Sequence, residues 1–303
     1  MFFRHLILFR LPVALDLSEL ETRLAEFPLK PVGPLELSSY GFVPPLAREH
    51  EAFAHRGPDE LEAIWLTIGG EVKILPGPVV NEALAKRIEE FEQQQGRRPG
   101  GKMRKQMKDD LLQELLPRAF VKPTRIDALI DLRNGVIAVN TSSRKAGENV
   151  VSAIRTALGS FPALPLNAEV SPRGVLTGWI AGEPLPAGLT IGDECELKDP
   201  SDQGATVRCT RQDMATEEIT RHLDAGKQVT KLGLNLDDHV SFVLGEDLAI
   251  RKFKLLDGAL DSLADVENDD LRAELDARFA LMVTEFRRLF AVLEPALKLS
   301  KAE

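Results

Sequence analysis

The sequence contains few of the residues that mark a secreted, membrane-spanning or metal-binding protein. Its 303 residues include two cysteines, Cys195 and Cys209, and their spacing of 14 matches no zinc-binding pattern. We therefore expect two buried free thiols in a reducing compartment. The apolar opening MFFRHLILFRL is short and is interrupted by Arg4, His5 and Arg10, which argues against a signal peptide or a membrane span. These absences predict a cytoplasmic protein without a membrane segment.

Motifs of common enzyme classes are also missing. The chain has no Gly-x4-Gly-Lys-Ser/Thr phosphate loop and no Gly-x-Ser-x-Gly nucleophile elbow. His50 and His55 lie five residues apart beside Glu49 and Glu51, but no further ligand completes a tetrahedral metal site. We predict no catalytic residue, no metal and no other cofactor.

One short pattern keeps an enzymatic alternative open. Glu196 and Lys198 form a Glu-x-Lys triplet, with Asp193 and Glu194 just before it. In some metal-dependent nucleases the carboxylates of such a triplet hold Mg²⁺ and the lysine lies near the attacking water. Alternating charges at the edge of a strand explain the same residues, and the triplet is common by chance.

The chain is acidic, with a formal charge of −9 and an isoelectric point near 5.3. One stretch, Gln95–Lys108, holds six basic residues and no acid, so the rest of the chain carries −15. A local positive field of this kind attracts phosphates, although a solvated loop whose bases only maintain solubility is the alternative. The six bases, which we call the basic island, are Arg97, Arg98, Lys102, Arg104, Lys105 and Lys108.

The residues around the basic island predict two helices joined by a turn, a helical hairpin over 78–117. Pro78 suits the first position of a helix, and apolar residues follow at helical spacing up to Phe91. Glycines and a proline break the pattern over Gly96–Gly101. A second apolar stripe then begins at Met103 and ends before Pro117.

Aromatic residues are scarce, with 14 Phe, two Trp and one Tyr, and none lies within the basic island. Proteins that bind single-stranded nucleic acid by stacking usually place exposed aromatics beside basic residues. Phe120 comes soon after the hairpin, as a core anchor or as an exposed contact.

The remaining chain predicts an α+β fold with largely antiparallel sheets, because strands come mostly as hairpins with helices between the groups. Gly69-Gly70 is expected to turn between two strands, as is Asn134-Gly135. Helices are expected to begin after Ser18 and after Thr216 as N-caps, and another should span Arg144–Leu158.

The second half of the chain predicts a three-stranded antiparallel meander between residues 229 and 255, followed by a long helix that ends before Pro295. Apolar residues of this helix recur from Leu275 to Leu293 at spacings of four and three. They suit packing against the meander, with a subunit interface as the alternative. A proline-rich stretch, Phe161–Pro172, suggests two lobes, 1–166 and 167–303.

Several strings in the chain resemble the RdgC family of bacterial recombination-associated proteins. These are the opening MFFRHLILFRL, GFVPP (Gly41–Pro45), KILPGPVVNEAL (Lys73–Leu84), LLPRAF (Leu115–Phe120) and RQDMATEEITRHLDAGKQVTKLGL (Arg211–Leu234). The resemblance implies a ring-shaped homodimer that binds double-stranded DNA without sequence preference, and single-stranded DNA more weakly. It also implies a nucleoid-associated protein that restrains the RecA recombinase by occupying DNA.

The resemblance further implies roles for single residues. Phe120 would lie at the subunit contact that closes the ring, and Arg211 and Gln212 at or near a DNA-facing part of it. The family often has lysine at position 211, and Arg211 keeps that charge. The full set of predicted DNA contacts is Arg97, Arg98, Lys102, Arg104, Lys105, Lys108, Arg118, Arg211, Gln212 and Lys227. A metal-dependent nuclease using Glu196 and Lys198, or a protein-binding scaffold, remains the alternative.

Overall fold

The computed structural model describes residues 3–12, 15–46, 52–201, 204–264 and 271–301. The chain divides into two compact units. The first, the main unit, comprises Met1–Glu26, Pro44–Thr67 and Ile126–Glu303. The second, the hairpin unit, comprises Phe27–Val43 and Ile68–Arg125. Both predicted lobes contribute to the main unit, so the division at residue 166 stays a prediction.

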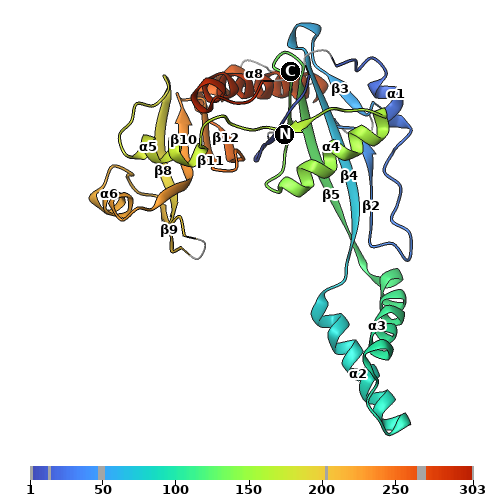
Figure 1. Cartoon of the computed structure of the whole chain (residues 1–303). Helices are drawn as coiled ribbons and strands as arrows, with labels where there is room; N and C mark the ends of the chain where they lie inside the picture. The colour runs from blue at the N-terminus through green and yellow to red at the C-terminus, as the bar shows by residue number, and fades with distance from the viewer. Residues whose placement is uncertain (1–2, 13–14, 47–51, 202–203, 265–270, 302–303) are drawn as a thin grey trace. The chain divides into compact units, whose positions relative to one another are not determined.

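The first sheet of the main unit is antiparallel. Its strands are β1 (Ile7–Arg10), β3 (Ala54–Arg56), β4 (Ala63–Ile74), β5 (Phe120–Asp131), β6 (Val136–Val139) and β7 (Leu164–Pro165), of which β4 and β5 continue into the hairpin unit. The order is β4-β5-β6-β1-β7, and β3 pairs with the other edge of β4 (Figure 1). Helices α1 (Leu20–Ala25) and α4 (Arg144–Leu158) pack together beside this sheet.

Two local predictions in this sheet are confirmed. Asp131 of β5 pairs with Val136 of β6, so the loop between them contains Asn134 and Gly135, as the turn signal predicted. Helix α4 spans Arg144–Leu158 and ends at Gly159, which has a φ of +76° that glycine adopts without strain.

The predicted turn at Gly69-Gly70 is wrong. Strand β4 runs through both glycines without a break. A Cβ atom at Gly69 would lie 2.7 Å from a methyl of Val43, and one at Gly70 would lie 2.6 Å from the hydroxyl of Thr124 and from the ring of Tyr40. The two glycines therefore allow neighbouring chain segments to approach the strand closely, and no reversal is needed.

Helix termini were predicted less well. Helix α1 begins after Glu19, so the predicted N-cap at Ser18 is wrong. Ser18 lies in the turn before the helix, where its N–H donates to Asp16 at 2.9 Å. Thr216 does precede α6 (Glu217–Asp224), but its side chain makes no capping hydrogen bond. Helix α8 (Leu271–Leu297) continues through Pro295 instead of ending before it.

The second sheet of the main unit has the antiparallel order β12-β11-β10-β8-β9. Its strands are β8 (Leu189–Lys198), β9 (Thr206–Thr210), β10 (Gln228–Leu236), β11 (Val240–Gly245) and β12 (Ile250–Leu255). Helices α5 (Pro172–Ile180), α7 (Asp257–Ala264) and α8 complete this part of the unit, with α6 after β9. The meander is thus confirmed as β10 to β12.

One face of the second sheet packs against α8. Phe286 and Leu289 of α8 are fully buried in the same hydrophobic core as Leu232 of β10. This burial confirms that the apolar stripe of α8 is a core face, as its spacing predicted. The first sheet joins the second, because Leu6 and Ile250 exchange backbone hydrogen bonds of 2.8 and 3.0 Å. The opposite face of the second sheet carries polar and charged residues.

In the hairpin unit, β2 (Ser38–Val43) pairs with β4, and the chain leads into α2 (Gly77–Gln95) and α3 (Gly101–Leu115). The Nζ atom of Lys73 donates to the carbonyl oxygens of Gly33, at 2.8 Å, and Pro34, at 2.5 Å. Glu71 accepts from the N–H of Val32 at 2.8 Å. These contacts hold the proline-rich stretch before β2 against β4.

Candidate nucleic-acid interface

Helices α2 and α3 form the predicted hairpin. Pro78 lies in the first turn of α2, and Gly96, at a φ of +65°, ends the helix. A Cβ atom at Gly100 or Gly101 would meet nothing within 4 Å, so the connecting turn is open to solvent. Arg87 of α2 contacts Glu114 of α3 at 3.0 Å and links the two helices.

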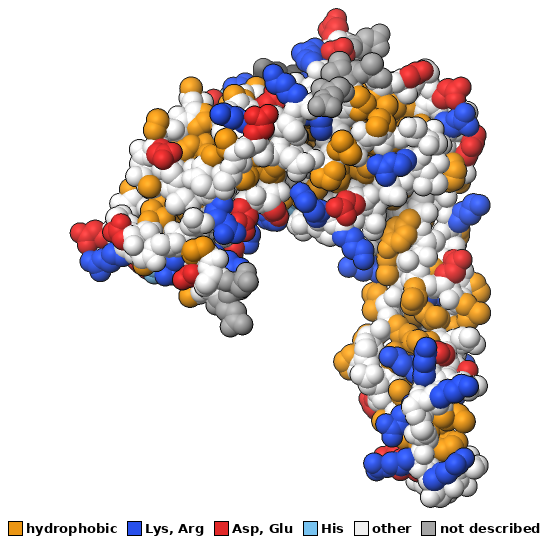
Figure 2. Space-filling view, in the orientation of Figure 1, with side chains coloured by type: hydrophobic (Ala, Val, Ile, Leu, Met, Phe, Trp, Pro, Cys, Tyr) orange, Lys and Arg blue, Asp and Glu red, His pale blue; other side chains and the backbone are white. Residues whose placement is uncertain are grey.

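The hairpin has little hydrophobic core of its own. Within the described residues, α2 buries only Val80 and α3 only Leu111. All six members of the basic island are exposed. Figure 2 shows lysine and arginine side chains along the hairpin, with apolar side chains between them. Arg98 contacts Glu92 at 3.1 Å, and Arg104 donates to the carbonyl of Pro99 at 3.1 Å.

The charge of the hairpin unit differs in sign from that of the main unit. The hairpin unit contains 13 lysines and arginines against nine aspartates and glutamates, a formal charge of +4. Because the whole chain carries −9, the main unit carries −13. This separation of charge places a positive field where a polyanion can approach without the repulsion of the whole chain.

Phe120 is not a core anchor of this chain. It begins β5, and its side chain is 84% exposed. Of the ten large hydrophobic side chains that the described part of the chain exposes, nine lie in the hairpin unit. They are Phe27, Leu35, Leu37, Tyr40, Ile74, Val79, Met103, Phe120 and Val121. The exposed large apolar side chains of the described residues are thus concentrated in the hairpin unit.

The other predicted DNA contacts lie in both units. Arg118 is exposed in the short 3-10 helix η2 (Leu116–Arg118) of the hairpin unit. Arg211 follows β9 in the main unit and is exposed at a φ of +60°. The backbone N–H of Gln212 donates to the carbonyl of Asp193 at 3.3 Å, while its side-chain Nε2 is buried without a hydrogen-bond partner. Lys227 is half-buried after α6.

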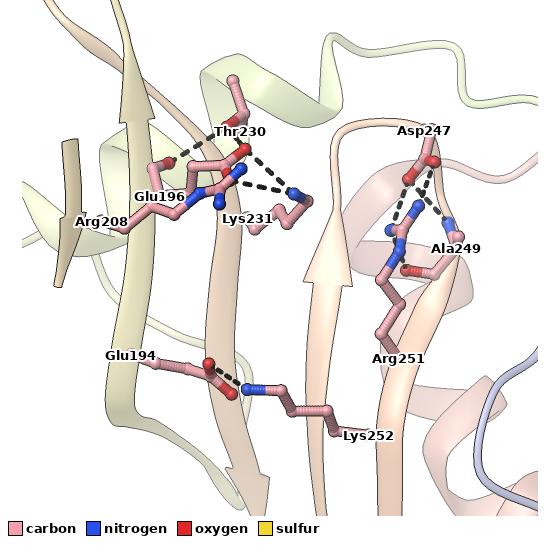
Figure 3. A network of polar contacts seen from close by, with 9 residues as sticks. All are labelled: Glu194, Glu196, Arg208, Thr230, Lys231, Asp247, Ala249, Arg251 and Lys252. Atoms are coloured by element: carbon pink, nitrogen blue, oxygen red, sulfur yellow. Dashed lines mark hydrogen bonds and ion pairs between the residues drawn. The ribbon is translucent and has the colours of Figure 1, made fainter. Parts of the chain in front are cut away.

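Glu196, the acid of the Glu-x-Lys triplet, forms part of an ion-pair network (Figure 3). Glu196 contacts Lys231 at 3.0 Å and Arg208 at 2.7 Å. Burial by itself would raise the pKa of Glu196, but the hydrogen bonds from these two cations outweigh it and lower the pKa. The described residues contain no group of three or more His, Cys, Asp or Glu that could hold a metal ion, and residues 49–51 lie outside them. The geometry therefore gives the nuclease alternative no support at Glu196.

The two cysteines are buried and free, as predicted. They lie directly opposite each other on β8 and β9. Burial, together with the neighbouring thiol of Cys209, raises the pKa of Cys195 to about 12. The thiol of Cys195 therefore lies in the core of the sheet in its protonated form, with the buried Cys209 opposite it.

Sequence reasoning missed the charged face of the second sheet. Lys231 lies on β10, whereas Arg251 and Lys252 are neighbours on β12, a strand too short to stand out in the sequence as a basic run. The alternation in IRKFKL of β12 was the available signal, because it places Lys252 and Lys254 on the face opposite the buried Phe253. Only the register of the strands shows that these side chains share one surface.

Comparison with known proteins identifies the family. The family model described as "Putative exonuclease, RdgC" matches residues 1–300. The chain belongs to the RdgC family. It is 65% identical, over 304 residues and 100% of both chains, to the recombination-associated protein RdgC of Xanthomonas campestris pv. campestris and also to that of Xanthomonas axonopodis pv. citri. The RdgC protein of Stenotrophomonas maltophilia is 60% identical over the same coverage.

The RdgC resemblance noted in the sequence is thus confirmed over the whole chain. The names of these relatives associate them with recombination, whereas the family description mentions an exonuclease. Across the described ranges, no helix is both long and apolar enough to cross a membrane.

Proposed function

We propose that this RdgC-family protein binds DNA through the phosphate backbone, without reading bases. The observation that carries the proposal is the basic island, six exposed cations on a hairpin unit of charge +4 in a chain of charge −9. Phosphate contacts give affinity and orientation without sequence information. The recombination-associated relatives support DNA as the polyanion.

We further propose that two copies close into a ring around duplex DNA, and that the ring restrains RecA by occupying DNA. The exposed apolar side chains of the hairpin unit, Phe120 among them, support a contact between copies. Single-stranded DNA is a weaker ligand in this proposal, and the protein acts in the cytoplasm at the nucleoid. The protein-binding scaffold has less support, because the apolar stripe of α8 is buried in the core.

Salt dependence tests the backbone-binding proposal. Each phosphate that a cation neutralises on duplex DNA contributes roughly −0.9 to the slope of log affinity against log salt concentration. Titration of duplexes of different sequence at several salt concentrations should give a slope of several units and nearly equal affinities. A preference for one sequence above about a hundredfold would show base readout and contradict the proposal.

A second experiment separates binding from nuclease activity. Closed-circular plasmid is incubated with the protein and Mg²⁺ and then analysed by electrophoresis with and without removal of the protein. Retarded migration that reverts to intact circles on deproteinisation is the expected result. Nicked or linear DNA that accumulates with the wild type but not with Glu196→Gln would establish the nuclease alternative instead.

A further inference from the structure

Two buried thiols face each other across the outer pair of strands in the second sheet. Cys195 of β8 and Cys209 of β9 lie directly opposite in the antiparallel register, and their side chains are joined by a hydrogen bond. Opposite residues of antiparallel strands have Cα atoms about 4.5 or about 5.5 Å apart, and disulfides span Cα distances of about 4.4–6.8 Å. The strand pairing therefore places the two sulfur atoms within reach of a disulfide without a change of register.

The packing around the two thiols admits a disulfide but no larger product of oxidation. Cys195 and Cys209 are 4% and 6% exposed, and they belong to the same hydrophobic core as Met214 and Ile219. A disulfide removes the two thiol hydrogens and adds no atom, whereas a sulfinic acid adds oxygen atoms to a sulfur. Because a packed interior tolerates little extra volume, the disulfide is the oxidised form that the native fold can hold.

The strand that carries Cys209 is the outermost strand of the sheet. It spans Thr206–Thr210, and in the described part of the chain it pairs with β8 alone. On the opposite face of this strand pair Arg208 contacts Glu196 at 2.7 Å, but the Arg208 side chain is 72% exposed and solvent screens the contact. Short edge strands open at a lower free energy than central strands. A covalent cross-link at this edge would therefore strengthen a weak part of the sheet.

The surroundings of the pair keep it reduced under mild conditions. Burial, with a further contribution from the neighbouring thiol of Cys209, raises the pKa of Cys195 to about 12. Arg208 and Lys231 contact Glu196 on the opposite face of the sheet, so these cations are directed away from the sulfur atoms. Because the thiolate is the form that reacts with oxidants, the pair should respond only to sustained oxidation.

We propose that Cys195 and Cys209 form an oxidation site, at which hydrogen peroxide produces a reversible disulfide that cross-links β9 to β8. The thiolate of one cysteine attacks a peroxide oxygen, the O–O bond breaks, and the products are a sulfenic acid and hydroxide. The hydroxide takes up the proton that this thiol released and becomes water. The second thiol then attacks the sulfenic sulfur, so the S–S bond forms, the S–O bond breaks, and a second water leaves with the proton of that thiol. The two sulfurs lose two electrons and the peroxide gains them.

The disulfide should raise the thermal stability of the main unit. It closes the chain over a separation of 14 residues, which restricts the unfolded chain more than the folded one. The melting temperature should therefore rise by about 5 °C. A thiol reductant returns the pair to the dithiol by exchange through a mixed disulfide, so the rise should be reversible. The inference does not depend on the proposed DNA binding, because neither sulfur is among the proposed phosphate contacts.

Peroxide treatment of the full-length protein tests the site. After catalase removes the peroxide, the remaining thiols are alkylated in urea and the peptides are identified by mass spectrometry. Peptides linked through Cys195 and Cys209 are the expected product, and dithiothreitol should restore both thiols. Calorimetry of the oxidised protein should show the higher melting temperature. The control Cys209→Ala lacks one sulfur, so peroxide should neither link its strands nor raise its melting temperature, and the wild-type result is decisive even if this variant does not fold.

The exposed Met103 gives an internal measure of the oxidant dose, because peroxide converts methionine to its sulfoxide. Two thiols that remain free when Met103 is fully oxidised would overturn the inference and make the pair an inert part of the core. Sulfinic acid at either cysteine, or a disulfide between two molecules, would overturn it as well. A disulfide that leaves the melting temperature unchanged or lower would show that the bond distorts the sheet, which contradicts the proposed cross-link. The measurements need no DNA, so a failure of DNA binding would leave their result unchanged.

Discussion

The basic island and the open face of the second sheet, which we call the sheet face and which carries Arg208, Lys231, Arg251 and Lys252, are both rich in lysine and arginine, but their bases come together in different ways. In the basic island the bases lie close together in the chain and no acid separates them, so the composition of Gln95–Lys108 alone predicts a positive field. On the sheet face, β8 carries charges of both signs and β12 carries three bases, and folding brings these strands into one sheet. The comparison shows that a cluster of bases can arise from a local run in the sequence or from strand register.

The two regions also differ in how firmly they hold their cations. Hairpin helices α2 and α3 bury one side chain each among those described, and the island's bases are solvated. The cations of the sheet face lie in a network above a well-packed core. Substitutions in the island should therefore change binding with little effect on stability, whereas those in the sheet face should change stability.

The largest expected effect comes from reversing the island. Replacing Lys102, Arg104, Lys105 and Lys108 by Glu changes four attractions into repulsions and should lower DNA affinity by well over tenfold. The melting temperature should change little, because all four side chains are exposed. Fluorescence anisotropy with a labelled duplex measures the DNA affinity, and calorimetry measures the melting temperature.

The matched control exchanges lysine and arginine at the same four positions, which conserves the charge. It should retain most of the affinity, with small differences where a bidentate contact is gained or lost. A folded Glu variant that binds as tightly as the wild type would place the DNA surface elsewhere, at the sheet face or near Arg211 and Lys227.

A second, smaller effect concerns the apolar side chains of the hairpin unit. Phe120→Ala should leave the melting temperature unchanged, since the ring is 84% exposed in the single chain. If Phe120 closes a ring, the substitution removes about 1–3 kcal/mol of apolar burial at the contact between copies. Dissociation should then accelerate more from closed circles than from short linear duplexes, which can leave through an end.

Measured dissociation rates on both kinds of DNA check this prediction, with the exposed Val121→Ala as a nearby control of smaller apolar area. The protein should remain dimeric through its other contact, as light scattering would show. Equal acceleration on circles and linear duplexes would make Phe120 a simple DNA contact, and unfolding would make it a structural residue.

A third prediction concerns the free energy of unfolding, which should depend on the ion pairs of the sheet face but not on the bases of the island. Glu196→Gln weakens the contacts with Lys231 and Arg208 and should cost about 1 kcal/mol at neutral pH, a low value because solvent screens Arg208. The pKa of Glu196 lies below its ordinary 4.5 in the folded chain. Its contribution is therefore complete above pH 4.5 and is lost as the pH falls through the folded pKa.

Urea denaturation of both proteins between pH 3 and pH 7 measures this difference. The control Glu217→Gln affects an exposed pair with Arg221 within one helix and should change stability by only a few tenths of a kcal/mol. A difference between wild type and Glu196→Gln that stays constant down to pH 3 would show that the carboxylate's charge does not stabilise the sheet.

The smallest expected effect is on the inner side of the same sheet. Because the pKa of Cys195 is raised to about 12 and both thiols are buried, alkylating reagents should modify neither cysteine in the native protein at pH 8. Both should react fully in urea. Mass spectrometry counts the labels, and rapid labelling of the native chain would show that the β8–β9 edge opens.

Local signals predicted the elements that depend only on neighbouring residues. Asn134-Gly135 gave a turn, Gly159 ended α4, and Pro78 with the glycines after Gln95 bounded the hairpin helices. In each case the backbone geometry follows from the residues themselves, such as the left-handed conformation that glycine accepts.

Signals that depend on distant neighbours were misread. Gly69-Gly70 has the composition of a turn, but both residues lie within a strand. The side chains of Val43 and Tyr40 approach them so closely that a Cβ atom would not fit. The exposure of Phe120 was likewise undecided, because a phenylalanine after a helix suits a core as well as a surface. Information of this kind lies in segments that are far apart in the sequence.

The sequence by itself determined the antiparallel α+β class, the RdgC family and the basic island, because propensity, periodicity and a run of like charges act over a few residues. The tertiary structure decided that Phe120 is exposed, that Glu196 is engaged by two cations, and that bases from three strands share one face. Strand register and bulges set these outcomes, since a shift of one residue moves every side chain of a strand to the opposite face.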